Sequence, residues 1–277
     1  MMGTGLMTLR RMFALVTGAI LLLGATHALA RNVWWQYERE MQTPINDPPD
    51  ADVPAEFAFA RLRYYSPLDR YQRARWGTDA NKSERQFIIA LRRLSRIDAK
   101  SIEQIVDIDS DDIYDWPFLY AVAAGDWVLS DSQAERLGNY LRRGGFLVVD
   151  DLHNDREWAD FMYGIEQALP EQLALHAGHL EEEIQDDDAI FHVVHDVHER
   201  IQISGWNIVS GRPYERGGYV PHWYAVRDAK DRIVVAAWFN QDLGDAWEWA
   251  DNPLYPERLA SLAFRFGVNY LTYSMTH

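Results

Sequence analysis

LRRGGFLVVDD, residues 141–151, joins the end of a helix to a short apolar strand through a pair of glycines. Residues 130–143 have helical spacing, with Ser130 as the N-cap, and the glycine pair follows their C-terminus as glycine often does at a helix end. Residues 146–150 (FLVVD) are apolar without alternation, which is typical of a strand buried on both faces. The stretch therefore predicts a helix followed by a central strand.

Units of the same kind lie on both sides of this stretch. Residues 118–123 (FLYAVA) predict another short buried strand, and residues 155–169 predict a helix that Pro170 ends. Apolar strands separated by amphipathic helices indicate a parallel sheet with right-handed crossovers and helices on both faces.

The remaining elements extend this pattern towards both ends of the chain. They are a strand at residues 57–65, a helix at 83–97 with Ser83 as N-cap, an antiparallel hairpin of 222–226 and 233–239 appended to the sheet, and a closing helix at 256–273. No repeat or second domain boundary is visible. The sequence therefore predicts a single three-layer α/β domain over residues 57–277, with a mainly parallel sheet.

Composition excludes several classes of function. The 277 residues include 27 Lys and Arg against 42 Asp and Glu, a formal charge of −15, and no Cys. Without Cys there is no disulfide framework, thiolate nucleophile, Cys-ligated zinc or iron–sulfur cluster. The acidic balance argues against nucleic acid or an anionic lipid surface as the main partner, because both require clustered positive charge.

The N-terminus carries the pattern of an export signal. Arg10 and Arg11 precede an apolar run at residues 12–24, and Ala28-Leu29-Ala30 supplies the small-x-small pattern of a cleavage site. The arginine pair resembles a twin-arginine signal, and the apolar run suits the general secretory route equally well. We expect residues 1–30 to be a signal peptide, residues 31–56 a proline-containing linker, and the protein to be periplasmic or otherwise extracytoplasmic. An uncleaved signal would instead anchor the chain to the membrane.

Several runs resemble the DUF4159 family of bacterial proteins. They are YDWPFLY at residues 114–120, Leu129-Ser130, residues 141–151, FGVNYLTY at residues 266–273, and residues 57–65. The resemblance covers about residues 55–275. It implies a fold like that of class I glutamine amidotransferases, which is flavodoxin-like, and a biochemical function that is uncharacterised.

The resemblance also implies partners, and the chain departs from the family pattern at one point. Members of the family often occur in exported or membrane-attached proteins encoded near MoxR-type ATPases and von Willebrand A-type proteins, which suggests membrane or envelope proteins as partners. This chain has Asp188-Ala189 where the family usually has His-Pro before Ile190-Phe191, so any ligand role of that His is in doubt. It also lacks the Cys that amidotransferases use, which excludes thiol-dependent glutamine hydrolysis.

One candidate catalytic or metal-binding group follows the strand at 146–150. Asp150, Asp151 and His153, with Asp155 nearby, fall where ligands bind in open α/β sheets, outside the carboxyl ends of the strands. Carboxylates and an imidazole could bind a divalent cation or act as an acid–base pair. The alternative is structural: one of the aspartates caps the helix at 155–169 or binds loop amides.

Two further groups are candidate ligand-binding residues. An arginine-rich group suits a carboxylate, phosphate or acidic glycan, or else pairs with the protein's own acids; it consists of Arg61, Arg63, Arg70, Arg73, Arg75 and Trp76. An acidic loop with Asp242, Trp247 and Trp249 could stack on a sugar, or its indoles could cover the hairpin.

Other clusters match metal templates poorly. Neither this loop nor the acidic run at residues 107–115 fits the calcium-loop pattern. His192, His195 and His198 are spaced three apart and are not expected to converge on zinc.

These observations favour an exported, non-catalytic binding or assembly module of the cell envelope. The alternative is a metal-dependent hydrolase acting on an envelope polymer or glycan. The hydrolase requires Asp150, Asp151, His153 and Asp242 to converge on one open pocket. No cofactor is required by the sequence, although a divalent cation is possible.

Overall fold

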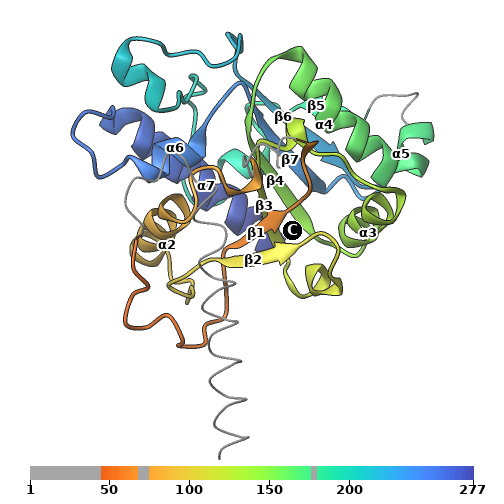
Figure 1. Cartoon of the computed structure of the whole chain (residues 1–277), viewed down its shortest axis with the longest axis horizontal. Coiled ribbons are helices and arrows are strands. Elements are labelled where there is room, and N and C mark those ends of the chain that lie inside the picture. The colour runs from red at the N-terminus through yellow and green to blue at the C-terminus, as the bar shows by residue number, and fades with distance from the viewer. Residues whose placement is uncertain (1–44, 68–74, 176–179) are drawn as a thin grey trace, which may run out of the picture.

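The computed structural model describes residues 45–67, 75–175 and 180–277, which form a seven-stranded sheet in the order β2-β1-β3-β4-β7-β6-β5 (Figure 1). The strands are β1 Ala60–Arg63, β2 Gln104–Asp107, β3 Phe118–Val122, β4 Phe146–Leu152, β5 Glu181–Glu183, β6 His222–Arg227 and β7 Ile233–Phe239. Strands β2, β1, β3, β4 and β7 pair in parallel, and β6 runs antiparallel to both β7 and β5. The predicted α/β domain with a mainly parallel sheet is confirmed, and the topology is consistent with a flavodoxin-like fold.

Helices cover both faces of the sheet (Figure 1). One face carries α2 Lys82–Leu94, α6 Leu243–Glu248 and α7 Glu257–Thr276, and the other carries α3 Asp131–Arg142, α4 Asn154–Ala168 and α5 Pro170–Leu175. Alternate side chains of β3 enter the two cores: Tyr120 packs under the first group of helices and Leu119 under the second. The chain is therefore three layers thick, as the uninterrupted apolar strands predict.

The stretch at residues 141–151 forms the predicted elements. Ser130 and Gln133 form a capping box at the start of α3, and Gly144 follows the helix with a φ of +104°, a conformation that suits glycine. Gly145 leaves room for the ring of Tyr140, because a Cβ at this position would lie 2.3 Å from that ring. The chain can therefore turn directly from α3 into β4.

Two local predictions are confirmed and two are wrong. Helix α4 ends at Ala168 with Leu169 as its C-cap, as predicted from Pro170, and Pro170 then begins α5. The antiparallel hairpin of β6 and β7 is present, and it joins the parallel strands through the pairing of β7 with β4. Helix α2, in contrast, starts at Lys82 with Asn81 as N-cap and not with Ser83, whose hydroxyl faces inward and contacts Arg61 and Glu84. The acidic segment after β7, predicted as a loop, contains α6.

The predicted signal peptide and the first part of the predicted linker lie outside the described residues. The rest of the linker is fixed to the domain, because the guanidinium of Arg85 donates to the carbonyls of Ile45 and Asn46 and to the carboxylate of Asp47. Among the described residues, no helix combines the length and the apolar character that a membrane crossing needs.

Candidate functional site

Asp150 lies at the carboxyl end of β4 and fastens α6 to the sheet. Its carboxylate accepts the backbone N–H groups of Leu243 at 3.0 Å and Gly244 at 2.6 Å, and the hydroxyl of Tyr120 at 2.8 Å. Burial raises the pKa of Asp150 to about 6, against the effect of these hydrogen bonds. Asp150 therefore acts as a buried cap for α6.

Asp151 turns away from Asp150 at an irregularity in the strand. The register of β4 against β7 shifts between Val149 and Leu152, and Asp151 has a φ of +52°. Its carboxylate lies 2.5 Å from the Arg216 guanidinium, 3.5 Å from that of Arg75 and 3.1 Å from Nε2 of His153. Burial would raise the pKa of Asp151, but these groups outweigh it and lower the pKa below its usual range.

His153 occupies the N-cap position of α4 without capping it. Its own N–H donates to Glu157 at 2.9 Å, and the side chain of Asn154 accepts the N–H groups of Arg156 and Glu157. No aspartate therefore caps this helix, but the other form of the structural alternative is confirmed, because Asp150 binds the backbone amides of Leu243 and Gly244. The imidazole is 2 % exposed and neither ring nitrogen makes a hydrogen bond of good geometry.

Asp242, Asp245 and Glu215 continue the polar group begun by Asp151 and His153. Asp242 caps α6 by accepting the N–H of Asp245 at 2.9 Å. Burial and the neighbouring carboxylates, Asp245 foremost, raise the pKa of Asp242 well above its usual range. We call Asp151, His153, Glu215, Asp242 and Asp245 the carboxyl-edge cluster.

The cluster divides into two sets that share Glu215. In each set the ligand atoms lie within 4.8 Å of one another; one set is Asp151, His153 and Glu215, and the other is Glu215, Asp242 and Asp245. Sequence reasoning missed Glu215 and its neighbour Arg216, because both lie in an irregular segment with no periodicity to place it at this edge.

The four residues that a hydrolase would require do not converge on one open pocket. Asp150 is 0 % exposed, Asp151 and His153 are each 2 % exposed, and Asp242 is 3 % exposed. Asp151 and His153 lie together beside Glu215, but Asp150 and Asp242 are committed to the N-terminus of α6. The expected convergence is therefore only partly found, and the expected opening is not found among the described residues.

The arginine-rich group is dispersed. Arg61 is fully buried and pairs with Glu84, Arg63 pairs with Asp107 at the surface, and Arg75 pairs with Asp126 and Asp151. Trp76 is buried, while Arg70 and Arg73 lie outside the described residues. For the three described arginines, the alternative of pairing with the protein's own acids is the correct one.

The sugar-stacking hypothesis is wrong because the two indoles do not form an exposed platform. Trp247 is 1 % exposed and packs against Phe87, with ring centroids 4.7 Å apart. Trp249 is half-buried against Trp206 at 4.3 Å. The three spaced histidines do not converge either, although His192 and His198 both contact Asp196 at the surface.

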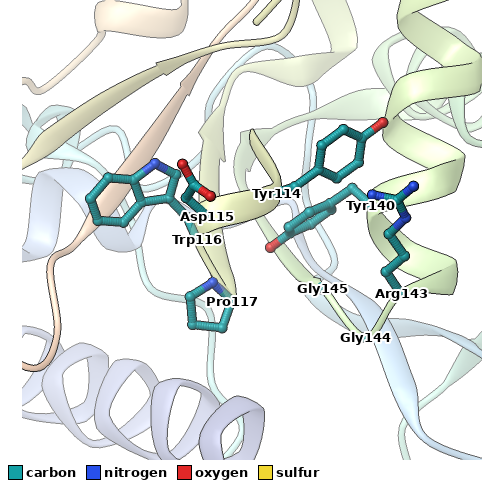
Figure 2. Close-up of a pocket in the computed structure, with 8 residues that line it drawn as sticks. All are labelled: Tyr114, Asp115, Trp116, Pro117, Tyr140, Arg143, Gly144 and Gly145. Carbon is teal, nitrogen blue, oxygen red and sulfur yellow. The ribbon is translucent and has the colours of Figure 1, made fainter. Parts of the chain in front are cut away.

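Two pockets lie at the opposite edge of the sheet, where β3 and β4 begin. One, of about 210 Å³, is lined by residues 114–117, Tyr140 and residues 143–145. Figure 2 shows the rings of Tyr114 and Tyr140 beside the guanidinium of Arg143, which lies 4.5 Å from the Tyr114 centroid. The second, of about 400 Å³, adds residues 52–58, Lys100 and Met275. The pockets share residues 115–117, and we call them together the amino-edge groove.

A family model for DUF4159, a domain of unknown function, matches residues 58–275. The chain belongs to the DUF4159 family. The match spans every strand and long helix described above, so the resemblance noted in the sequence is confirmed. None of the curated proteins matches the chain.

In this DUF4159 chain, the Asp188 that replaces the usual His has contacts within the fold. Its carboxylate accepts the N–H of Ile190 and pairs with Arg227 on β6. Asp188 therefore caps the short helix Ala189–Phe191 and ties it to the outer part of the sheet.

Proposed function

We propose that this DUF4159 protein is an exported, non-catalytic binding or assembly module of the bacterial cell envelope. The observation that carries the proposal is the contrast between the two edges of the sheet. The carboxyl edge, where α/β enzymes hold their substrates, is closed by the protein's own side chains, and the amino edge is grooved. Export rests on the N-terminal sequence pattern.

The closed edge supports binding over turnover. Asp150 and Asp242 are committed to the N-terminus of α6, and Asp151 is committed to Arg216 and Arg75. A substrate would have to displace these buried contacts before it reached a carboxylate. The chain also has no Cys, so it lacks the thiol nucleophile that amidotransferases use.

The amino-edge groove has the character of a protein-binding surface. The half-buried rings of Tyr114 and Trp116 line the groove together with the charged residues Arg143, Asp115 and Lys100. Tyr140 also lines it but is only 2 % exposed. Binding energy at protein interfaces concentrates on aromatic and arginine side chains, with charged groups at the rim. Two of the runs that resemble DUF4159, residues 114–120 and 141–151, supply most of the first pocket.

These features favour a protein partner in the envelope. We propose membrane or envelope proteins linked to MoxR-type ATPase systems, because family members are often encoded beside such systems. The acidic composition argues against nucleic acid, and against lipid surfaces beyond the signal segment.

Affinity capture from the native envelope tests the proposal. The tagged protein is expected to retain a membrane or envelope protein, and Arg143→Glu is expected to reduce its recovery about tenfold or more, as for loss of an interface arginine. The matched control is Arg156→Glu, an exposed residue at the start of α4 and hence at the other edge of the sheet. Failure to retain any partner, or equal losses in both variants, would contradict the proposal.

A metal-dependent hydrolase is the second candidate, favoured by the grouping of Asp151 and His153 with Glu215. It predicts that the protein with Zn²⁺ or Mn²⁺ releases soluble fragments from isolated envelope polymer, and that Asp151→Asn does not. The proposed binding role predicts no release in either case.

A further inference from the structure

We infer that the carboxyl-edge cluster binds a divalent transition-metal ion, of the Zn²⁺ or Mn²⁺ class, through Asp151, His153 and Glu215. Asp242 and Asp245 surround the same Glu215 from the α6 side. The inference goes beyond the proposed binding role, which involves the other edge of the sheet and does not depend on a metal.

The spacing of the donor atoms suits coordination. Nε2 of His153 lies 3.1 Å from a carboxylate oxygen of Asp151. Two ligands at about 2.1 Å from one metal ion are about 3.0–3.4 Å apart along an edge of an octahedron or tetrahedron. The nearest atom of Glu215 in this set lies within 4.8 Å of both, so a small rotation of its half-buried side chain completes the set.

The imidazole of His153 is the observation that points to a ligand. It is 2 % exposed, its nitrogens are buried, and neither nitrogen makes a hydrogen bond of good geometry. A buried polar group that makes no hydrogen bond destabilises the folded state, and most buried polar groups in proteins do make one. Coordination by one nitrogen would account for a buried imidazole directed at carboxylates.

The charge around the cluster also favours a cation. The carboxylates of Asp151, Glu215, Asp242 and Asp245 share one buried region, where Arg216 and Arg75 both lie against Asp151. The charged groups that act most strongly on the Asp242 carboxyl are all carboxylates. Buried like charges are expensive unless a counter-ion is present. Arg216 contacts the oxygen of Asp151 that faces His153 and Arg75 contacts the other, so these cations sit at Asp151, on one side of the four carboxylates.

The donor set selects the class of metal. One imidazole among carboxylates suits Zn²⁺ or Mn²⁺ better than Ca²⁺ or Mg²⁺, which prefer oxygen ligands throughout. Asp150, a candidate ligand from the sequence, is instead occupied by the N–H groups of α6.

The metal would fasten a long irregular segment to the sheet. Glu215 belongs to the segment between β5 and β6. In this segment Gln202 donates to the carbonyls of Gly218 and Asn240. Asn154, at the start of α4, donates to the carbonyl of Arg216. A shared cation adds a bond from this segment to β4. Its role is therefore to stabilise the closed carboxyl edge.

Metal titration of the purified, chelator-treated protein tests the inference. Zn²⁺ or Mn²⁺, added alone, is expected to bind in calorimetry and to raise the melting temperature. At about 100 times Kd, the ratio of folded to unfolded protein should increase about 100-fold. Glu215→Gln is expected to weaken binding by at least about tenfold, since it removes a ligand.

The surface group His192, Asp196 and His198 provides the control, because its ligand atoms also lie within 4.8 Å of one another. The double variant His192→Ala/His198→Ala is expected to bind the metal as the unaltered protein does. The inference is overturned if neither metal binds, if Glu215→Gln binds unchanged, or if the double variant loses binding.

A spectroscopic readout covers the case in which Glu215→Gln does not fold. Mn²⁺ bound to the double variant labelled with ¹⁵N-histidine is expected to show coupling to imidazole nitrogen in pulsed electron paramagnetic resonance. Absence of that coupling would contradict coordination by His153.

Discussion

Replacing Arg61 by Met is expected to lower the free energy of unfolding by about 3–5 kcal/mol, because it leaves a buried carboxylate without its counter-ion. Arg61 and Glu84 are both 0 % exposed and form an ion pair. The guanidinium also donates to the carbonyls of Trp76 and Thr78, each at 2.8 Å, so the substitution removes a connection between β1 and the segment before α2. Denaturant unfolding monitored by tryptophan fluorescence measures the loss.

Two variants isolate the effect of burial. Arg63→Met, two residues along the same strand, removes a surface pair with Asp107 and is expected to cost less than about 1 kcal/mol. The double variant Arg61→Met/Glu84→Met is expected to recover much of the loss, because the carboxylate that Arg61 pairs with is then removed together with it. A loss in Arg61→Met no greater than that in Arg63→Met would refute the assignment.

Replacing Asp150 by Ala is expected to cost about 3–5 kcal/mol, because the N–H groups of Leu243 and Gly244 then lack their carboxylate acceptor. The cost should depend on pH. The pKa of Asp150 is about 6 in the folded protein against 3.8 ordinarily, so the folded state binds the proton more tightly. The stability that this group contributes is greatest below pH about 4 and falls as pH rises to about 6.

The deficit of the Ala variant should therefore grow as pH falls from about 6 to about 4, when it is measured by denaturant unfolding at each pH. Asp155→Ala is the control, since Asp155 is an exposed carboxylate in the first turn of α4, and it should cost less than about 1 kcal/mol at every pH. If the loss of unfolding free energy in Asp150→Ala instead becomes smaller as pH falls, the pKa of Asp150 in the folded protein is not raised, and the prediction is refuted.

The central layers of the fold were predictable because their signals are local and strong. Ser130 and the glycine pair fix the ends of α3, and the uninterrupted apolar residues of β3 and β4 require cover on both faces. The carboxyl edge was predictable in the same way, since Asp150 and Asp151 lie at the carboxyl end of the buried strand β4.

What escaped prediction depends on tertiary contacts. The sequence left open whether Arg61 binds a ligand or pairs with an acid of the protein, because a charge inside a β-strand gives no sign of Glu84, which lies 23 residues away and buried beside it. Helix α6 is only six residues long and shows no usable periodicity, so the sequence could not decide whether Trp247 forms a sugar-binding platform or covers the hairpin. Glu215 reaches the cluster from irregular chain, and only the folded structure brings it to His153.

Binding at the amino-edge groove is tested most directly by photo-crosslinking in the native cell. A benzophenone amino acid replaces Asp115, an exposed residue that lines both pockets. The control places it at Tyr163, which is 63 % exposed on α4. Irradiation is expected to join an envelope protein to position 115 and not to position 163. No adduct at 115, or the same adduct from both positions, would contradict a partner-binding groove at this edge of the sheet.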